Sequence, residues 1–137
     1  MITGRCECGK IRFETTDTIS DFSHCHCSMC RRLHGAAFAS WGGVSKASFR
    51  YRSGEDSVKT YHSSELMDRM FCMHCGSSFM SFFKEEPEMI YLTMGNLDGN
   101  PEHPPGYHFF VSSKADWIEI CDGLPQWEEW PDEDSAD

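Results

Sequence analysis

Long apolar segments and positive charge are both scarce in this chain. No apolar run approaches the roughly 18 residues that a membrane-crossing helix needs, and the mean hydropathy is −0.50. Only 12 lysine and arginine residues stand against 22 acidic residues, which gives a formal net charge of −10. Binding to nucleic acid requires basic side chains that neutralise phosphates. The composition therefore argues against a membrane protein and against a general nucleic-acid-binding protein.

The sequence shows no internal repeat and no linker, and we expect no secretory leader. Residues 1–10, MITGRCECGK, contain no basic stretch followed by an apolar segment. A chain of 137 residues is long enough for one domain that buries about two-thirds of its unfolded surface. We therefore expect one cytoplasmic domain at residues 1–127, followed by an acidic, disordered tail at residues 128–137, which holds six acidic and no basic residues.

Cysteine, by contrast, is abundant, with eight residues in the chain. Seven of them fall into three tight clusters: Cys6-x-Cys8, Cys25-x-Cys27-x-x-Cys30 and Cys72-x-x-Cys75. An even number of cysteines in a short chain is typical of a disulfide framework in a secreted protein. Bridges inside such short spacings would close strained rings, and bridges between clusters would leave one of the seven thiols unpaired. We therefore interpret the clusters as metal ligands in a reducing compartment.

The numbers of cysteines in the clusters indicate two different metal sites. Zinc takes four ligands in a tetrahedron, and thiolate sulfurs lie about 2.3 Å from the ion. The two outer clusters together supply four cysteines, whereas the middle cluster supplies three. Structural zinc sites are closed by protein ligands, but catalytic sites keep one position for water or substrate. We predict two zinc ions per chain, one structural and one open, although the spacing also permits a different partition of the clusters.

Glycine follows the last cysteine of both outer clusters, as Gly9 after Cys8 and Gly76 after Cys75. Glycine adopts positive φ without strain, which allows a tight turn whose backbone amides face the thiolates. Two such turns far apart in the sequence predict that one zinc ion fastens the amino-terminal hairpin to the middle of the chain. Such a structural site can contribute on the order of 10–16 kcal/mol to folding.

The middle cluster is followed by arginine instead of glycine. Three thiolates on a divalent ion leave a net charge of −1, which a guanidinium group offsets. A guanidinium group also binds an anionic ligand through two hydrogen bonds. Arg32 is therefore a candidate anion clamp, and the alternative is that it belongs to a solvated basic turn.

Several histidines lie close enough in sequence to complete this site as a fourth ligand: His24, His26, His34 and His74. The spacing favours His34, four residues after Cys30. His26 stands between two ligating cysteines, and its side chain is expected to point away from the metal. A histidine ligand would close the site and would weaken the case for a catalytic role.

Short alternating segments indicate an all-β fold, in which short antiparallel strands form a folded sheet or barrel-like sandwich stapled by zinc. Strands are predicted at five segments: residues 10–14, 48–52, 89–94, 107–111 and 117–121. The last of these would bury the isolated thiol of Cys121 as a small apolar side chain. One helical turn is expected at residues 28–34, ended by Gly35 in a left-handed cap.

Taken together, the motifs resemble a known family. They are GRCECGKIRF at residues 4–13, CHCSMCRR at 25–32, RMFCMHCGS at 69–77, HFFVSSKADW at 108–117 and DGLP at 122–125. In this order they resemble the glutathione-dependent formaldehyde-activating family, whose domain is shared with the centromere protein V group. The resemblance covers residues 4–127 and implies the all-β Mss4-like fold.

The resemblance also implies roles for the cysteines. By it, Cys6, Cys8, Cys72 and Cys75 match the family's structural zinc ligands. Cys25, Cys27 and Cys30 match the three-cysteine zinc site at which the family's chemistry takes place. The named activity joins formaldehyde and glutathione to S-hydroxymethylglutathione, which is a carbon–sulfur lyase reaction. The resemblance therefore implies a zinc-dependent lyase that binds a small thiol, such as glutathione, or its aldehyde adduct.

Two physical roles are compatible with an open zinc site of this kind. The metal can bind a substrate thiol, lower its pKa and hold the thiolate against a carbonyl carbon. It can also polarise the aldehyde oxygen as a Lewis acid. Three electron-rich thiolates make zinc a modest Lewis acid, so we favour thiol capture. The alternative function is that of a non-catalytic, zinc-stapled binding module with the Mss4-like fold.

Overall fold

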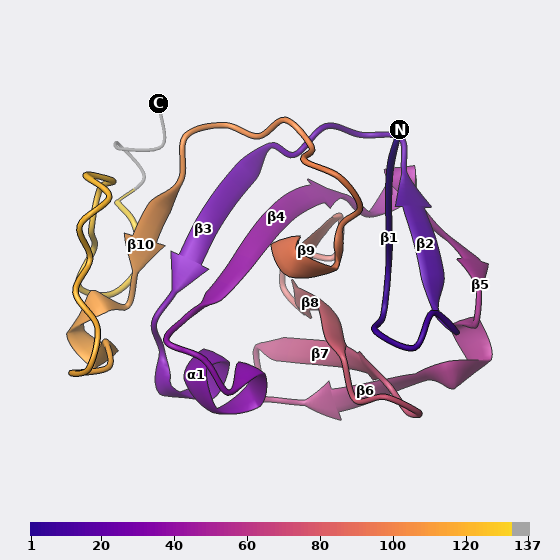
Figure 1. Ribbon diagram of the computed structural model, residues 1–137, viewed down its shortest axis with the longest axis horizontal. Coiled ribbons are helices and arrows are strands. Elements are labelled where there is room, and N and C mark those ends of the chain that lie inside the picture. The colour runs from indigo at the N-terminus through magenta and orange to yellow at the C-terminus, as the bar shows by residue number, and fades with distance from the viewer. Residues whose placement is uncertain (133–137) are drawn as a thin grey trace.

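The computed structural model describes residues 1–132, so the last five residues of the predicted tail, 133–137, lie outside the described part. Strands dominate the described chain (Figure 1). The strands are β1 (Ile2–Arg5), β2 (Arg12–Thr15), β3 (Asp21–Cys25), β4 (Ala39–Ser45), β5 (Phe49–Ser53), β6 (Val58–His62), β7 (Met67–Cys72), β8 (Ser78–Phe83), β9 (Met89–Thr93) and β10 (Tyr107–Phe109). The helical segments are α1 (Ser28–His34) and the short 3-10 turns Lys46–Ser48, Glu55–Ser57, Met94–Asn96 and Val111–Ser113.

The strands belong to two sheets. β1, β2 and β5 form a small antiparallel sheet beside the amino terminus, and the other strands form a larger sheet in the order β10-β3-β4-β9-β8-β7-β6 (Figure 1). Neighbours in the larger sheet are antiparallel, except that β10 pairs in parallel with β3. The all-β fold class predicted from the sequence is therefore confirmed, with one parallel pair added to the predicted antiparallel pattern.

The main hydrophobic core joins the two sheets. Phe13 of β2 stacks on Phe79 of β8 with ring centroids 5.8 Å apart. Phe49 of β5 also packs against the Phe13 ring, with centroids 5.4 Å apart. Full burial of a side chain of this size contributes roughly 1.5–3 kcal/mol. A smaller, separate cluster of buried side chains contains Cys25, Cys30, Ala39 and Trp41. The predicted three-cysteine site therefore has a rigid apolar support of its own.

The helix α1 begins and ends where the sequence predicts. Cys27 is its N-cap, and the Cys27 Sγ accepts a hydrogen bond from the Cys30 backbone N–H at 3.3 Å. At the other end Gly35 has φ +57° and ψ +41°, and its N–H donates to the Arg31 carbonyl. Because this left-handed conformation strains other L-residues, the glycine fixes where the helix stops.

The strand predicted at residues 117–121 is wrong. Within the described chain this segment forms no strand, and the Lys114 Nζ donates instead to the carbonyl oxygens of Ala115 and Ile118, at 3.0 and 2.7 Å. Cys121 is consequently exposed and not buried. Alternation of apolar and polar residues produces a strand only where a neighbouring strand supplies hydrogen-bond partners, and here the partners are local.

The chain that follows this segment returns to β10. The Trp127 N–H donates to the His108 carbonyl, and the Phe110 N–H donates to the Glu129 carbonyl, both at 2.9 Å. The Trp130 ring then packs against Phe110, with centroids 5.0 Å apart. The domain boundary at residue 127 stays a prediction, but the residues that directly follow it contact the domain.

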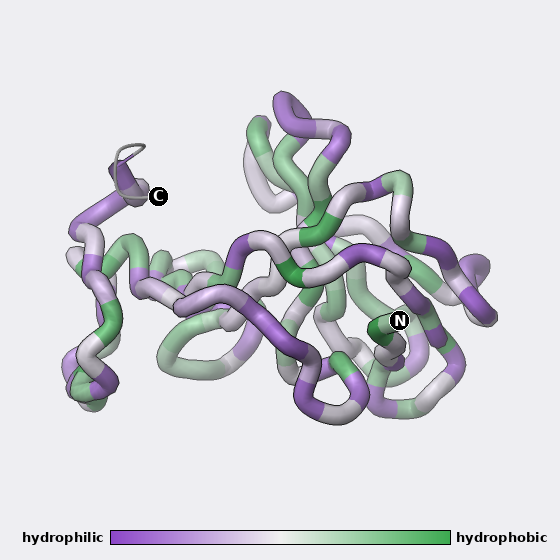
Figure 2. Tube along the Cα trace, turned by 90° about the horizontal axis from the view of Figure 1, so that it is seen from above, coloured by the Kyte–Doolittle hydropathy of each residue, from purple (hydrophilic) through white to green (hydrophobic). Residues whose placement is uncertain are grey.

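Apolar and hydrophilic stretches alternate along the described trace, without one long apolar stretch (Figure 2). No helix among the described residues has the length and apolar character needed to cross a membrane.

Candidate functional site

Four cysteines from distant parts of the chain gather where the two sheets meet: Cys6, Cys8, Cys72 and Cys75. Their Sγ atoms all lie within 4.8 Å of one another. The Cys8 Sγ is 3.6 Å from the Cys6 Sγ and 3.8 Å from the Cys72 Sγ. Sulfurs placed about 2.3 Å from a tetrahedral zinc ion would be about 3.8 Å apart. The group can therefore hold a zinc ion, and the structure brings the two outer clusters together as the sequence predicts.

Each pair of outer cysteines sits in a turn that ends in glycine. Gly9 and Gly76 both have a φ of +78°, where an L side chain would be strained. In each turn a backbone N–H donates to the Sγ of the first cysteine, at 3.4 Å in both cases. Amides that point at sulfur stabilise a thiolate. The two turns therefore prepare the sulfurs for a cation, and a cation shared between them would tie the small sheet to β7.

The middle cluster forms a second group where β3 ends and α1 begins. The Sγ atoms of Cys25, Cys27 and Cys30 lie within 4.8 Å of one another. Cys25 and Cys30 are buried, whereas Cys27 is partly exposed. Among the residues that the structure describes, no further cysteine, histidine or acid joins this group. Its donor set suits zinc, and it supplies three of the four ligands that the ion takes.

The three thiols are arranged to share one negative charge. Hydrogen bonds from Cys25 and then from Cys30 lower the pKa of Cys27 to about 2. The pKa of Cys25 is raised, first because its thiol donates to Cys27 and then because of Cys30 and burial. Binding of a divalent cation requires all three sulfurs as thiolates and would release the remaining protons.

The histidines near the cysteines are directed to other partners. The His34 ring meets Trp41 edge-on, with centroids 5.3 Å apart. His24 and His74 pair with serine hydroxyls at 2.7 and 3.1 Å. The fourth-ligand role considered for His34 therefore finds no support in the geometry, and the group keeps its three cysteines.

His26, between Cys25 and Cys27, points away from the sulfurs as the sequence predicts. Its Nε2 is 2.8 Å from the His108 Nδ1, and the His108 Nε2 is 2.8 Å from the Asp122 Oδ2. Because a carboxylate only accepts, the His108 Nε2–H donates to Asp122 and the His26 Nε2–H donates to His108. Burial lowers the pKa of His26 to about 4, which keeps its ring neutral. This chain of hydrogen bonds anchors the loop that carries the cysteines.

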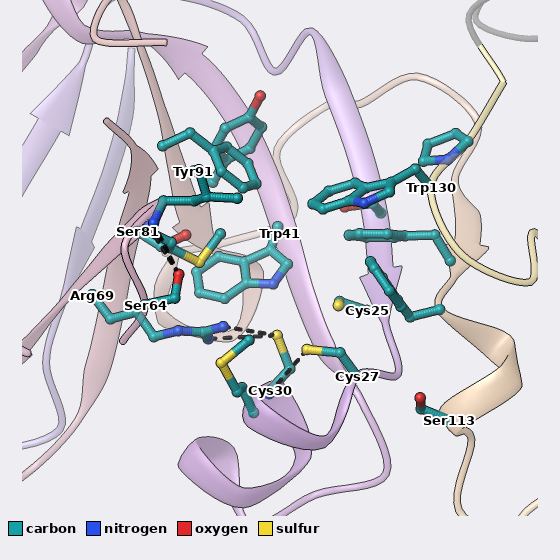
Figure 3. Close-up of a pocket in the computed structure, with 18 of the residues that line it drawn as sticks. Cys25, Cys27, Cys30, Trp41, Ser64, Arg69, Ser81, Tyr91, Ser113 and Trp130 are labelled. Carbon is teal, nitrogen blue, oxygen red and sulfur yellow. Dashed lines mark hydrogen bonds between the residues drawn. The ribbon is translucent and has the colours of Figure 1, made fainter. Parts of the chain in front are cut away.

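Arg69 of β7 is the charged side chain closest to the middle cluster. It is 5 % exposed, and its two terminal nitrogens lie 3.4 and 3.5 Å from the Cys30 Sγ. Its Nε–H donates to the Ser63 hydroxyl at 3.0 Å. Its Cζ atom lies 5.9 Å from the centroid of the Trp41 ring, and Figure 3 shows the two side chains together. A buried cation needs a counter-charge, and the Cys27 thiolate, whose pKa Arg69 helps to lower, supplies it.

The guanidinium that the sequence places at this site is Arg32, but the structure exposes Arg32 and leaves it outside the cavity beside the sulfurs. Arg69 occupies that place instead. Arg69 belongs to β7 and lies 39 residues after Cys30 of α1. The residues next to it in sequence therefore give no signal of this contact. His108 and Asp122 were also missed as partners of His26, although both lie in the segments that carry the family resemblance.

A cavity of about 500 Å³ opens beside the three cysteines (Figure 3). Residues of the larger sheet, from β3, β4, β7, β8, β9 and β10, line it, together with residues at the start of α1. The lining includes all three cysteines, Arg69, two acids (Asp21 and Glu86) and a group of aromatic side chains: Trp41, Phe83, Tyr91, Tyr107, Phe109, Phe110 and Trp130. The size is typical of a site for a small molecule.

The fold and the sites define a class of protein: an all-β domain with one closed four-cysteine group and one three-cysteine group that faces a small-molecule cavity. The model of the family described as "Glutathione-dependent formaldehyde-activating enzyme" matches residues 1–113. The chain belongs to this family, as the cysteine motifs predict.

Individual relatives agree with this assignment. The chain is 26 % identical over 127 residues to a protein of Halomonas elongata named "Putative glutathione-dependent formaldehyde-activating enzyme", covering 88 % of this chain and 81 % of that protein. It is 31 % identical over 75 residues to an uncharacterized lyase of Schizosaccharomyces pombe, covering 55 % and 53 % of the two chains. A crystal structure of a Rhodobacter sphaeroides protein has the same fold, with a TM-score of 0.61 at 21 % identity over 91 % of this chain and 98 % of that one.

Proposed function

We propose that the protein is a zinc-dependent enzyme of the carbon–sulfur lyase type, which joins a small thiol to an aldehyde or separates the two. The observation that carries this proposal is the middle cluster. It offers three cysteines and no further protein ligand among the described residues, and it lies at the end of a cavity of about 500 Å³. Family membership and the lyase-named relative support the same type of reaction.

The two groups of cysteines would have different tasks. The four-cysteine group would hold a structural zinc ion that ties the small sheet to β7, because its ligands come from both. The middle group would hold a second zinc ion, which would supply a position where a substrate thiol binds and loses its proton. Thiol chemistry of this kind needs a reducing compartment, for which we propose the cytoplasm.

The reaction balances without an external reagent. In the addition, the thiol sulfur forms a bond to the carbonyl carbon, and the π electrons of the C=O bond move to oxygen. The proton lost by the thiol ends on that oxygen, and the reverse sequence releases thiol and aldehyde. Arg69 would offset the negative charge of a metal-bound Cys30 sulfur through its contacts at 3.4 and 3.5 Å. The aromatic walls would reduce the access of water to the reacting atoms.

Exchange spectroscopy tests this proposal. Nuclear magnetic resonance of an equilibrated mixture of formaldehyde and a thiol measures how fast free and bound aldehyde interconvert, and glutathione and phenylmethanethiol serve as the two thiols. The zinc-loaded protein should raise the exchange rate in proportion to its concentration with at least one of them. Cys27→Ala should abolish this increase, whereas Cys121→Ala, which changes an exposed thiol outside both groups, should retain it. Equal rates for Cys27→Ala and the unaltered protein would refute the proposal.

A further inference from the structure

The cavity extends along β3 from the sulfur of Cys25 to the carboxyl group of Asp21. Asp21, Ser23 and Cys25 occupy alternate positions of β3, and all three line the cavity. A strand rises about 3.3 Å per residue, so the α-carbons of Cys25 and Asp21 are roughly 13 Å apart. A molecule that reaches the sulfurs with one end can therefore extend along β3 towards Asp21.

The walls between these ends are aromatic. Trp41 and Tyr91 stand on one side, and Trp130 lies on the opposite side (Figure 3). Phe109 and Phe110 also line the cavity. The Trp130 ring contacts both phenylalanines, with centroids 6.0 and 5.0 Å apart. Rings in this arrangement bind apolar and aromatic groups through large contact areas.

The charges of the cavity are distributed unevenly. At the end away from the sulfurs, Asp21 accepts a hydrogen bond from the Tyr107 hydroxyl at 3.0 Å, and Glu86 accepts one from the Tyr91 hydroxyl at 3.1 Å. Burial raises the pKa of Asp21, and the nearby charge of Glu86 raises it further against the effect of Tyr107. Among the described lining residues, Arg69 is the only basic side chain, and it is committed to Cys30, Ser63 and Trp41.

These features disfavour a carboxylated thiol. Recognition of a carboxylate needs a guanidinium, an ammonium or convergent backbone amides. Glutathione carries two carboxylates, and the charged groups that line the described cavity are two acids, the three-cysteine group and a committed arginine. Building on the function proposed above, we infer that the preferred substrate is a thiol, or its aldehyde adduct, with an apolar body and no carboxylate.

A matched series of thiols tests this inference. Phenylmethanethiol, its para-carboxylate and its para-aminomethyl derivative differ mainly in charge, and glutathione is the fourth probe. With cobalt in place of zinc, thiol binding at the three-cysteine group changes the visible spectrum, while the four-cysteine group stays constant. The two thiols without a carboxylate, phenylmethanethiol and its para-aminomethyl derivative, should each bind at least about tenfold more tightly than the para-carboxylate and than glutathione, because like charges in close contact are strongly unfavourable.

A second experiment removes the two acidic charges at the end of the cavity away from the sulfurs. Asp21→Asn combined with Glu86→Gln should reduce the preference for the neutral thiol over the para-carboxylate to less than about threefold, by removing the repulsion. The matched control is Asp56→Asn with Glu88→Gln, which removes two exposed acids outside the cavity and should leave the preference unchanged.

The outcomes separate the inference from the proposed function. Tighter binding of glutathione or of the para-carboxylate than of phenylmethanethiol would overturn the inference while leaving a thiol-binding metal site intact. An unchanged preference in the Asp21→Asn, Glu86→Gln protein would also overturn the role of the two acids. A spectrum that responds to none of the four thiols would instead refute the proposed function itself.

Discussion

Arg69 places a positive charge against a sulfur ligand in a buried environment. Three thiolates and a divalent cation carry a net charge of −1, and a guanidinium within 3.5 Å of Cys30 compensates it. Partners that hold a metal ligand in place affect metal binding almost as much as the ligands do. Arg69 is therefore expected to control the affinity of the three-cysteine group without touching the metal.

Replacing Arg69 tests this expectation. Arg69→Met keeps an unbranched apolar stem but removes the charged guanidinium, and it should weaken zinc binding at the three-cysteine group by about 10–100-fold. The loss of zinc to a coloured chelator measures the affinity, and the zinc ion of the four-cysteine group should be retained. Arg32→Met is the control, because Arg32 is exposed and lies outside the cavity. Equal zinc loss from both variants would contradict the role given to Arg69.

At the scale of elements, the metal-binding turns and α1 were predictable from local sequence. Cys-x-Cys-Gly and Cys-x-x-Cys-Gly fix both the sulfur spacing and the positive φ of Gly9 and Gly76, and Gly35 marks the end of α1. These features depend on neighbours in the chain, so the pattern contains the information. The strand predicted at 117–121 failed because its hydrogen-bond partners depend on the fold.

The lining of the cavity was not predictable in the same way. Arg69 and Trp41 come from β7 and β4, and Tyr91 from β9, and only the pairing of strands brings them to one face. β7 contains two charged residues, Asp68 and Arg69, that are both buried. Its sequence therefore has the pattern of a polar, exposed segment and does not predict a buried strand. The sequence therefore indicates where metal ligands are but not what surrounds them.

The two turns that form the four-cysteine group should determine stability. Cys75→Ala removes one ligand from a site whose zinc can contribute on the order of 10–16 kcal/mol, so most of the protein should be unfolded or insoluble. Cys27→Ala should lower the zinc content by one ion and leave the thermal unfolding transition largely unchanged. Melting curves followed by circular dichroism, together with elemental analysis, check both statements. If Cys27→Ala were the less stable variant, the structural and open sites would have to be exchanged.

At the scale of the whole molecule, stability and chemistry are separated in space. The four-cysteine group lies where the small sheet meets β7, whereas the three-cysteine group lies where β3 meets α1, beside the cavity. The Asp122–His108–His26 chain of hydrogen bonds holds the loop between Cys25 and Cys27, and Arg69 contacts Cys30. A domain of this size can therefore expose one metal ligand position to substrate while the other metal site holds the sheets together.

A crystal structure of the zinc-loaded protein soaked with phenylmethanethiol tests the central claim most directly. Anomalous scattering locates the zinc ions, and the density around each identifies its ligands. We predict four cysteine sulfurs at one ion, and at the other Cys25, Cys27, Cys30 and the sulfur of the added thiol, with its ring between Trp41 and Trp130. A protein side chain such as His34 in the fourth position, or no metal at the three cysteines, would contradict the claim.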